Sequence, residues 1–238
     1  MPSRARCFRC CAWPRLGPYL EKRADEETLV DLEEVYFDRY QRFRAAAELL
    51  AEMFPGQRLD LLDIGGFDDA FREFVPEHRI TAFSGIISQG NKAPFADVAF
   101  DVSIALDVLE HVASGDRQFF LSEIARVARL GCLVSFPAPQ AREAEEFVWR
   151  LTGSAWLAEH KIHDLPDPGK FETMARKLGL SLTKRPSASL PSWTAMMLLM
   201  HGVDKPLRHE ISAFFNRHFY QTENREPAYR YIYFCRKD

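Results

Sequence analysis

Residues 100–112 read FDVSIALDVLEHV, an apolar run that passes directly into a short polar segment. The apolar part, from Phe100 to Leu106, has the length and the β-branched content of a strand that is buried on both faces. The polar part begins at Asp107, where such a strand would end. Ligands of open α/β sheets bind at the carboxyl ends of parallel strands, so we expect a ligand site at this point.

A second buried strand is predicted by residues 59–66, which read LDLLDIGG. Leu59 to Ile64 forms the apolar run, and two glycines follow it. Glycine allows a tight turn and a close approach of the backbone to a ligand, although a tight structural turn explains such a pair about as well. We expect this strand to lie beside and parallel to the strand at 100–106, with Gly65 and Asp107 at the same edge of the sheet.

The remaining pattern alternates between helices and strands. A long helix with one apolar stripe is expected from Asp25 to Met53, where Pro55 and Gly56 end it. Further helices are predicted at 68–74, 116–128, 143–151, 171–178, 193–200 and 207–220, and further strands at 80–83, 86–87, 132–136, 180–183 and 229–235. The stretch from Pro186 to Pro191 is interpreted as a linker-like break. This alternation predicts an α/β fold with a doubly wound, mostly parallel sheet that is covered on both faces.

Length and composition set broad limits on the chain. Its 238 residues suit a single domain at 21–238 after a flexible extension at 1–20. The formal net charge of −3 gives no general attraction to nucleic acid, and no apolar run is long enough to span a membrane. The 5 cysteines show no disulfide framework, which favours a reducing, cytoplasmic setting.

Several motifs in one order resemble the class I S-adenosylmethionine-dependent methyltransferases, a family with a Rossmann-like fold. The motifs are an Ala-Pro-Phe-x-Asp loop at 93–97, a strand that begins with Phe-Asp at 100, and the sequence Leu-Glu-His-Val at 109–112. The helix and strand at 119–137 continue the resemblance. It implies a cofactor-binding core at 58–137, a substrate-side half at 138–238 and an N-terminal helical cap at 25–54.

The same resemblance implies roles for individual residues. Asp63, Gly65 and Gly66 would line the methionine and ribose part of S-adenosylmethionine. Leu106 and Asp107 would lie against the sulfonium region. The implied activity is methyl transfer to a small-molecule or glycan acceptor, and no motif in the sequence identifies that acceptor.

Two further candidate cofactor-binding residues, Gln89 and Ser84, stand at positions where this sequence departs from the family pattern. Gln89 occupies the place of an acid that contacts the adenine, and a glutamine can still hydrogen-bond to an adenine edge. Ser84 lies near the end of the second strand, where the family has an acid that binds both ribose hydroxyls, and Phe67 replaces a further glycine. The alternative hypothesis is therefore a degenerate protein that keeps the fold for binding or scaffolding without catalysis.

Several histidines and cysteines are candidates for acid–base catalysis or for metal binding. His111 is the candidate general base, although a structural role at the start of a helix is the favoured interpretation. Glu159, His160, His163 and Asp164 are interpreted as part of a pocket-rim loop rather than as a metal site. The cluster of Cys7, Cys10 and Cys11 lacks a second ligand pair, so no metal is expected there.

Overall fold

The computed structural model describes residues 32–66 and 70–237. The expected extension at 1–20, the cysteine cluster within it, the first part of the expected cap and Phe67 lie outside these described residues. Everything below concerns the described part of the chain.

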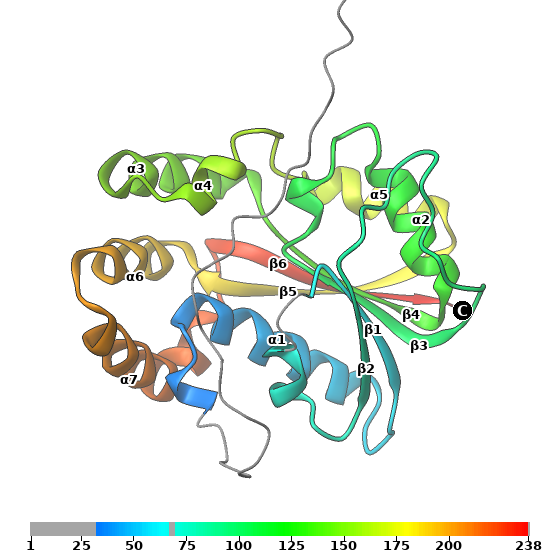
Figure 1. Ribbon diagram of the computed structural model, residues 1–238, viewed down its shortest axis with the longest axis horizontal. Coiled ribbons are helices and arrows are strands. Elements are labelled where there is room, and N and C mark those ends of the chain that lie inside the picture. The colour runs from blue at the N-terminus through cyan, green and yellow to red at the C-terminus, as the bar shows by residue number, and fades with distance from the viewer. Residues whose placement is uncertain (1–31, 67–69, 238) are drawn as a thin grey trace, which may run out of the picture. The chain divides into compact units, whose positions relative to one another are not determined.

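The fold is built on one sheet of six strands in the order β2-β1-β3-β4-β6-β5 (Figure 1). The strands are β1 (Asp60–Ile64), β2 (Arg79–Phe83), β3 (Phe100–Leu106), β4 (Ala128–Pro137), β5 (Leu180–Ser189) and β6 (Ala228–Lys237). Strands β2, β1, β3 and β4 are mutually parallel, and β6 runs antiparallel to both of its neighbours. The expected parallel pairing is confirmed, since Leu62 of β1 pairs with Ser103 of β3.

Helices cover both faces of the sheet (Figure 1). Helix α1 (Phe37–Met53) lies on one face, and helices α2 (Arg117–Val127) and α5 (Pro168–Lys177) lie on the other. Successive residues of a strand point to opposite faces. Leu61 accordingly packs in the core on the α1 side, and its neighbour Leu62 packs in the core on the α2 and α5 side. A fully apolar strand is what two covered faces require.

Helix α1 starts later than the sequence pattern suggested. The expected start near Asp25 lies outside the described residues. Within them, the expectation of one continuous helix is wrong, because a 3-10 helix at Leu32–Glu34 is followed by a break before Phe37. Tyr36 at this break has an extended ψ of 131°, which interrupts the helical hydrogen bonds. From there Phe43 and Leu50 pack on the sheet, so that α1 forms part of a covering layer.

The second half of the chain adds four helices and a third core. They are α3 (Arg142–Thr152), α4 (Ala155–Glu159), α6 (Leu190–Gly202) and α7 (Lys205–Glu223). Trp193 of α6 stacks on Tyr229 of β6 with ring centroids 3.8 Å apart, which joins this core to the sheet. None of the described helices is both long and apolar enough to cross a membrane.

Two local expectations are corrected by the structure. Ile86 and Ile87 do not form a strand: Ile86 is 74% exposed, and the chain here makes a tight turn bridged between Ser88 and Asn91. The expected linker at 186–191 is instead the end of β5 and the start of α6. Pro186 is compatible with this strand because β5 lies at the edge of the sheet, where a missing N–H leaves no inner neighbour unpaired.

A substitution at Gly131 tests how closely β4 and β6 approach each other. Its φ is 150°, and a Cβ at this position would overlap the carbonyl oxygen of Cys235 on β6. We expect Gly131→Ala to lower the free energy of unfolding by about 3 kcal/mol through strain and a displaced strand. Gly202→Ala is the matched control, because a Cβ there meets no atom within 4 Å. Urea unfolding of both variants measures the difference, and equal stabilities would contradict the pairing of β4 with β6.

Candidate active site

The two glycines after β1 are required for different physical reasons. Gly65 has a φ of 85°, which L side chains rarely adopt, and a Cβ there would come within 2.7 Å of the Val108 side chain. Gly66 has no such φ, but a Cβ would overlap the carboxylate of Asp63. The turn after β1 therefore lies against the segment after β3, and the Asp63 carboxylate occupies the space that a side chain at 66 would fill.

Other predicted site residues lie along the same edge of the sheet. Leu106 ends β3, and its side chain is buried in the core on the α1 side. Ser84 follows β2 and is exposed. Gln89 is exposed as well, and its side-chain amide donates to the carbonyl of Gly115 at 3.2 Å, just before α2. The structure thus brings Asp63, Gly65, Gly66, Leu106 and Asp107 together, whereas Ser84 and Gln89 lie on flanking loops.

Asp107 is the most strongly held residue at this edge. Its φ is 53°, a left-handed conformation that turns the chain sharply at the end of β3. Its Oδ2 forms ion pairs with Arg42 of α1 at 2.7 Å and with Arg230 of β6 at 3.0 Å. Its Oδ1 accepts a hydrogen bond from the Ser135 hydroxyl at 2.6 Å. Three separate elements, namely α1, β4 and β6, therefore fix this one carboxylate.

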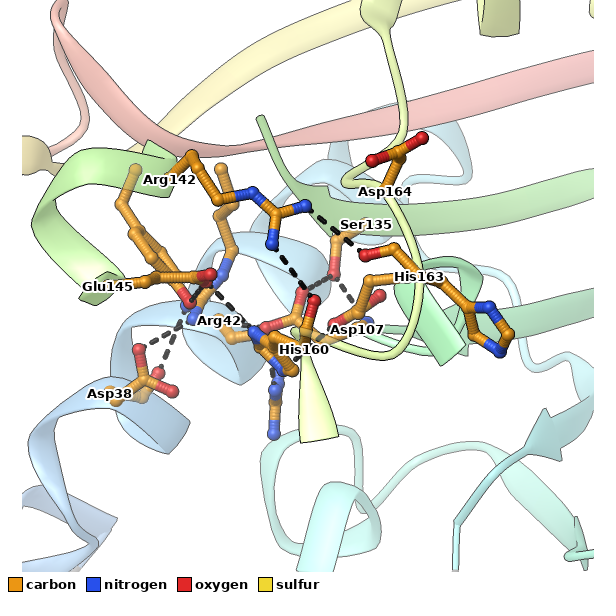
Figure 2. A network of polar contacts seen from close by, with 12 residues as sticks. Asp38, Arg42, Asp107, Ser135, Arg142, Glu145, His160, His163 and Asp164 are labelled. Atoms are coloured by element: carbon orange, nitrogen blue, oxygen red, sulfur yellow. Dashed lines mark hydrogen bonds and ion pairs between the residues drawn. The ribbon is translucent and has the colours of Figure 1, made fainter. Parts of the chain in front are cut away.

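A second carboxylate completes the network (Figure 2). Arg230 is fully buried and donates to the Asp38 carboxylate at 2.6 Å. The same Asp38 oxygen accepts from the indole N–H of Trp193 at 2.8 Å. The chain Asp38–Arg230–Asp107–Arg42 alternates in sign, so two arginines are balanced by two carboxylates, and we refer to these four residues as the ion-pair network.

Opposing effects set the charge of Asp107. Burial alone would raise the pKa of its carboxyl group, but the positive charges of Arg230 and Arg42 outweigh this effect and hold the pKa at about 2. Asp107 is therefore ionised at neutral pH. Its stabilising contribution is fully present above the ordinary Asp pKa of about 3.9 and is lost as the pH falls toward 2.

A second group of titratable side chains lies next to this network. Glu110 and His111 belong to the 3-10 helix Leu109–His111 that follows β3, and His160 follows α4. Burial, followed by the charge of Asp107, raises the pKa of Glu110 to about 8. Burial, followed by the charge of His160, lowers the pKa of His111 to about 4. His111 is thus neutral at pH 7, but its low basicity makes it a weak general base.

Sequence reasoning missed several members of this site. Asp38, Arg42 and Arg230 were not among the candidate site residues. The signal available was a charged residue inside an apolar strand, because Arg230 stands in the run AYRYIYF at 228–234. A buried arginine requires a paired carboxylate, but the sequence does not say which of the 34 acids provides it.

Asp107→Asn tests the ion-pair network. This change keeps the side-chain shape but leaves the buried Arg230 with one carboxylate in place of two. We expect a loss of about 3 kcal/mol in the free energy of unfolding at pH 7, since breaking a buried ion pair is strongly destabilising. The difference from the parent should shrink between pH 4 and pH 2, where Asp107 itself becomes protonated. Chemical unfolding across this range measures it, and a difference independent of pH would argue against the ion pairs.

Comparisons with known proteins concern the family and the fold. A family model described as a methyltransferase domain matches residues 19–136. Comparison of the sequence with curated proteins finds no match. Among solved structures, the plantazolicin methyltransferase BpumL in complex with S-adenosylhomocysteine is similar with a TM-score of 0.53 at 11% identity, over 87% of each chain.

Two further solved structures are similar over part of their length. An O-methyltransferase family protein from Burkholderia thailandensis has a TM-score of 0.48 at 10% identity, over 87% of this chain and 59% of that one. The phosphoethanolamine N-methyltransferase 2 of Haemonchus contortus has a TM-score of 0.47 at 12% identity, over 82% of this chain and 52% of that one. The domain match covers α1, β1, β2 and β3. The chain belongs to the class I S-adenosylmethionine-dependent methyltransferase family, whose members are enzymes that use S-adenosylmethionine as cofactor.

Proposed function

We propose that this chain transfers a methyl group from S-adenosylmethionine to a small-molecule or glycan acceptor at the edge formed by the ends of β1 and β3. The observation that carries the proposal is the turn at Gly65 and Gly66, which holds the Asp63 carboxylate against bare backbone. Bare backbone lets a ligand approach closely, and a carboxylate can bind an ammonium group. Both features suit the charged methionine end of the cofactor.

The ion-pair network gives the proposed site a balance of charges that suits a cationic cofactor. The family resemblance places the cationic sulfonium near Leu106 and Asp107. Arg42 is the partly exposed member of the network, and its charge is balanced by Asp107. Without that carboxylate, only Asp38 would balance the two arginines, and the remaining positive charge would oppose the binding of a cation. We therefore assign Asp107 the role of maintaining a neutral environment there, in addition to fixing α1 and β6.

Positioning is the main catalytic contribution that we assign to the protein. Methyl transfer needs chiefly an in-line approach of the acceptor to the methyl group. His111 has too low a pKa to be an efficient base, so an acceptor of low pKa or another group would be required for deprotonation. The cap role of residues 25–54 is part of the same proposal. The net charge of −3 favours a small acceptor over nucleic acid.

The degenerate, non-catalytic alternative rests on Ser84. This residue stands exposed after β2 and supplies a single hydroxyl where the family has a carboxylate. A binding or scaffold protein with this fold would tolerate that loss. Cofactor affinity distinguishes the two functions, because the catalytic proposal requires binding and the alternative does not.

Asp63 should contribute more to cofactor binding than Ser84. A charge-assisted hydrogen bond contributes roughly 1.5–3 kcal/mol, whereas a neutral hydroxyl contributes nearer 1 kcal/mol. Asp63→Ala should therefore weaken the binding of S-adenosylhomocysteine by about tenfold to a hundredfold, and Ser84→Ala by only a few fold. Calorimetric titration measures both. An unchanged affinity in Asp63→Ala would place the cofactor elsewhere, and binding by Ser84→Asp but not by the parent would support the degenerate alternative.

Asp107→Asn should change the preference between two ligands that differ in charge. S-adenosylmethionine carries a sulfonium, and S-adenosylhomocysteine carries a neutral thioether. An unbalanced arginine several ångströms away should weaken the binding of the cation by about tenfold relative to the neutral ligand. Arg42→Met is the control, because it removes a positive charge while Arg230 still pairs with Asp107. Competition titrations at low salt give the ratio of affinities, and equal weakening of both ligands by Asp107→Asn would refute this electrostatic role.

A further inference from the structure

Three potential metal ligands converge beside the ion-pair network. They are Glu110, His111 and His160. Glu110 and His111 follow β3, and His160 follows α4, 49 residues after His111. One ligand atom of each lies within 4.8 Å of the other two. Nothing in the sequence pattern connects Glu110 with His160, and the interpretation of residues 159–164 as a pocket-rim loop did not foresee their proximity.

The buried atoms of this cluster lack partners within the described part of the chain. Glu110 is 1% exposed and His160 is 0% exposed. Neither oxygen of the Glu110 carboxylate has a hydrogen-bond partner there, and neither does Nε2 of His160. The shortest separation between the two groups is 3.9 Å, which is too long for a hydrogen bond. Buried polar groups without partners are rare in folded proteins, and an ion bound between these groups would satisfy both of them.

His160 is oriented in the way that metal-binding histidines are. Its Nδ1 lies 2.9 Å from the Glu145 carboxylate, which also accepts a hydrogen bond from the Tyr229 hydroxyl at 2.8 Å. Arg142 donates to the His160 carbonyl at 3.2 Å and holds the segment in place (Figure 2). A carboxylate on one ring nitrogen fixes the tautomer and directs the other nitrogen toward the metal. Here the other nitrogen, Nε2, is the one without a partner.

We propose that Glu110, His111 and Nε2 of His160 bind one divalent transition-metal ion of the zinc class. Two imidazoles and one carboxylate suit Zn²⁺, Co²⁺, Fe²⁺ or Ni²⁺, whereas Mg²⁺ and Ca²⁺ prefer oxygen ligands alone. Ligand atoms at about 2.0–2.1 Å from tetrahedral zinc are about 3.4 Å apart, so small side-chain rotations would bring these atoms into place.

The number of ligands has a chemical consequence. Three protein ligands leave a coordination position open for water or for an oxygen of a bound molecule. His111 is the half-buried member of the three, so access to the ion lies on its side of the cluster. Metal binding itself does not depend on the proposed methyl transfer, and it can be tested without cofactor or acceptor.

Metal titration of the full-length chain tests the proposal. Protein stripped with a chelator is titrated with Zn²⁺ by calorimetry and with Co²⁺ by visible absorption, and we expect one ion per chain with the spectrum of nitrogen and oxygen ligands. Glu110→Gln and His160→Gln should each weaken binding by at least a hundredfold. Glu145→Gln should weaken it by roughly tenfold to a hundredfold through loss of ring orientation. His218→Asn, an exposed histidine on α7, is the matched control and should bind as the parent does.

Two further measurements keep the result unambiguous. Circular dichroism establishes that each variant is folded, and His111→Asn provides a half-buried ligand change if the fully buried ones do not fold. A variant with Cys7, Cys10 and Cys11 replaced by serine must retain the ion. Absence of stoichiometric binding by the parent, or loss of the ion in the cysteine variant with retention in Glu110→Gln, would overturn the proposal. In that case no metal ion binds to the cluster, and the Glu110 side chain is a protonated, neutral carboxyl group.

Discussion

The pairing of Asp107 with Arg42 and Arg230 is the interaction on which the site depends. The carboxylate stands at the end of β3, one arginine comes from α1, and the other comes from β6. These elements are far apart in the sequence, and one buried charge fixes all three at the same edge of the sheet. Because a buried charge without a partner is strongly unfavourable, the network permits few alternative arrangements of α1 and β6 around β3. Asp38 and Trp193 extend the same constraint to α6.

The network also separates two kinds of chemistry at one edge. On the β1 side, the Asp63 carboxylate lies against the bare backbone of Gly66, where we propose that the cofactor binds. Further along the segment after β3, Glu110 and His111 lie close to His160. Within the described part of the chain, the two carboxylate oxygens of Glu110 and Nε2 of His160 have no hydrogen-bond partner. The turn at Asp107, with its left-handed φ, lies between them and directs the chain from the first site toward the second. A single sharp turn thus connects a proposed cofactor site with a proposed metal site.

Much of the fold could be predicted from local pattern. The strand at 100–106 and its parallel neighbour were predicted almost to the residue, because strands buried on both faces are continuously apolar and need no knowledge of their partners. Helix α2 was also predicted from local pattern, because its apolar residues recur on one face. The errors fell where tertiary context overrides local preference. Pro186 was read as a break, yet it is tolerated in β5 because that strand lies at the sheet edge. Ile86 and Ile87 have strand propensity, but none of the strands in the described part of the chain pairs with them.

The sequence by itself determined the family, the alternation of strands and helices, the strand that carries Asp63, and the turns that carry the two glycines and Asp107. These depend on short motifs in a fixed order, which are visible without coordinates. Only the tertiary structure decided which charges meet. The partners of Asp107 lie 65 residues before it and on the last strand, and His160 reaches Glu110 from the second half of the chain. The physical reason is that ion pairs and metal ligands are selected by distance in space, and the sheet order β3-β4-β6 brings together residues whose separation along the chain carries no signal.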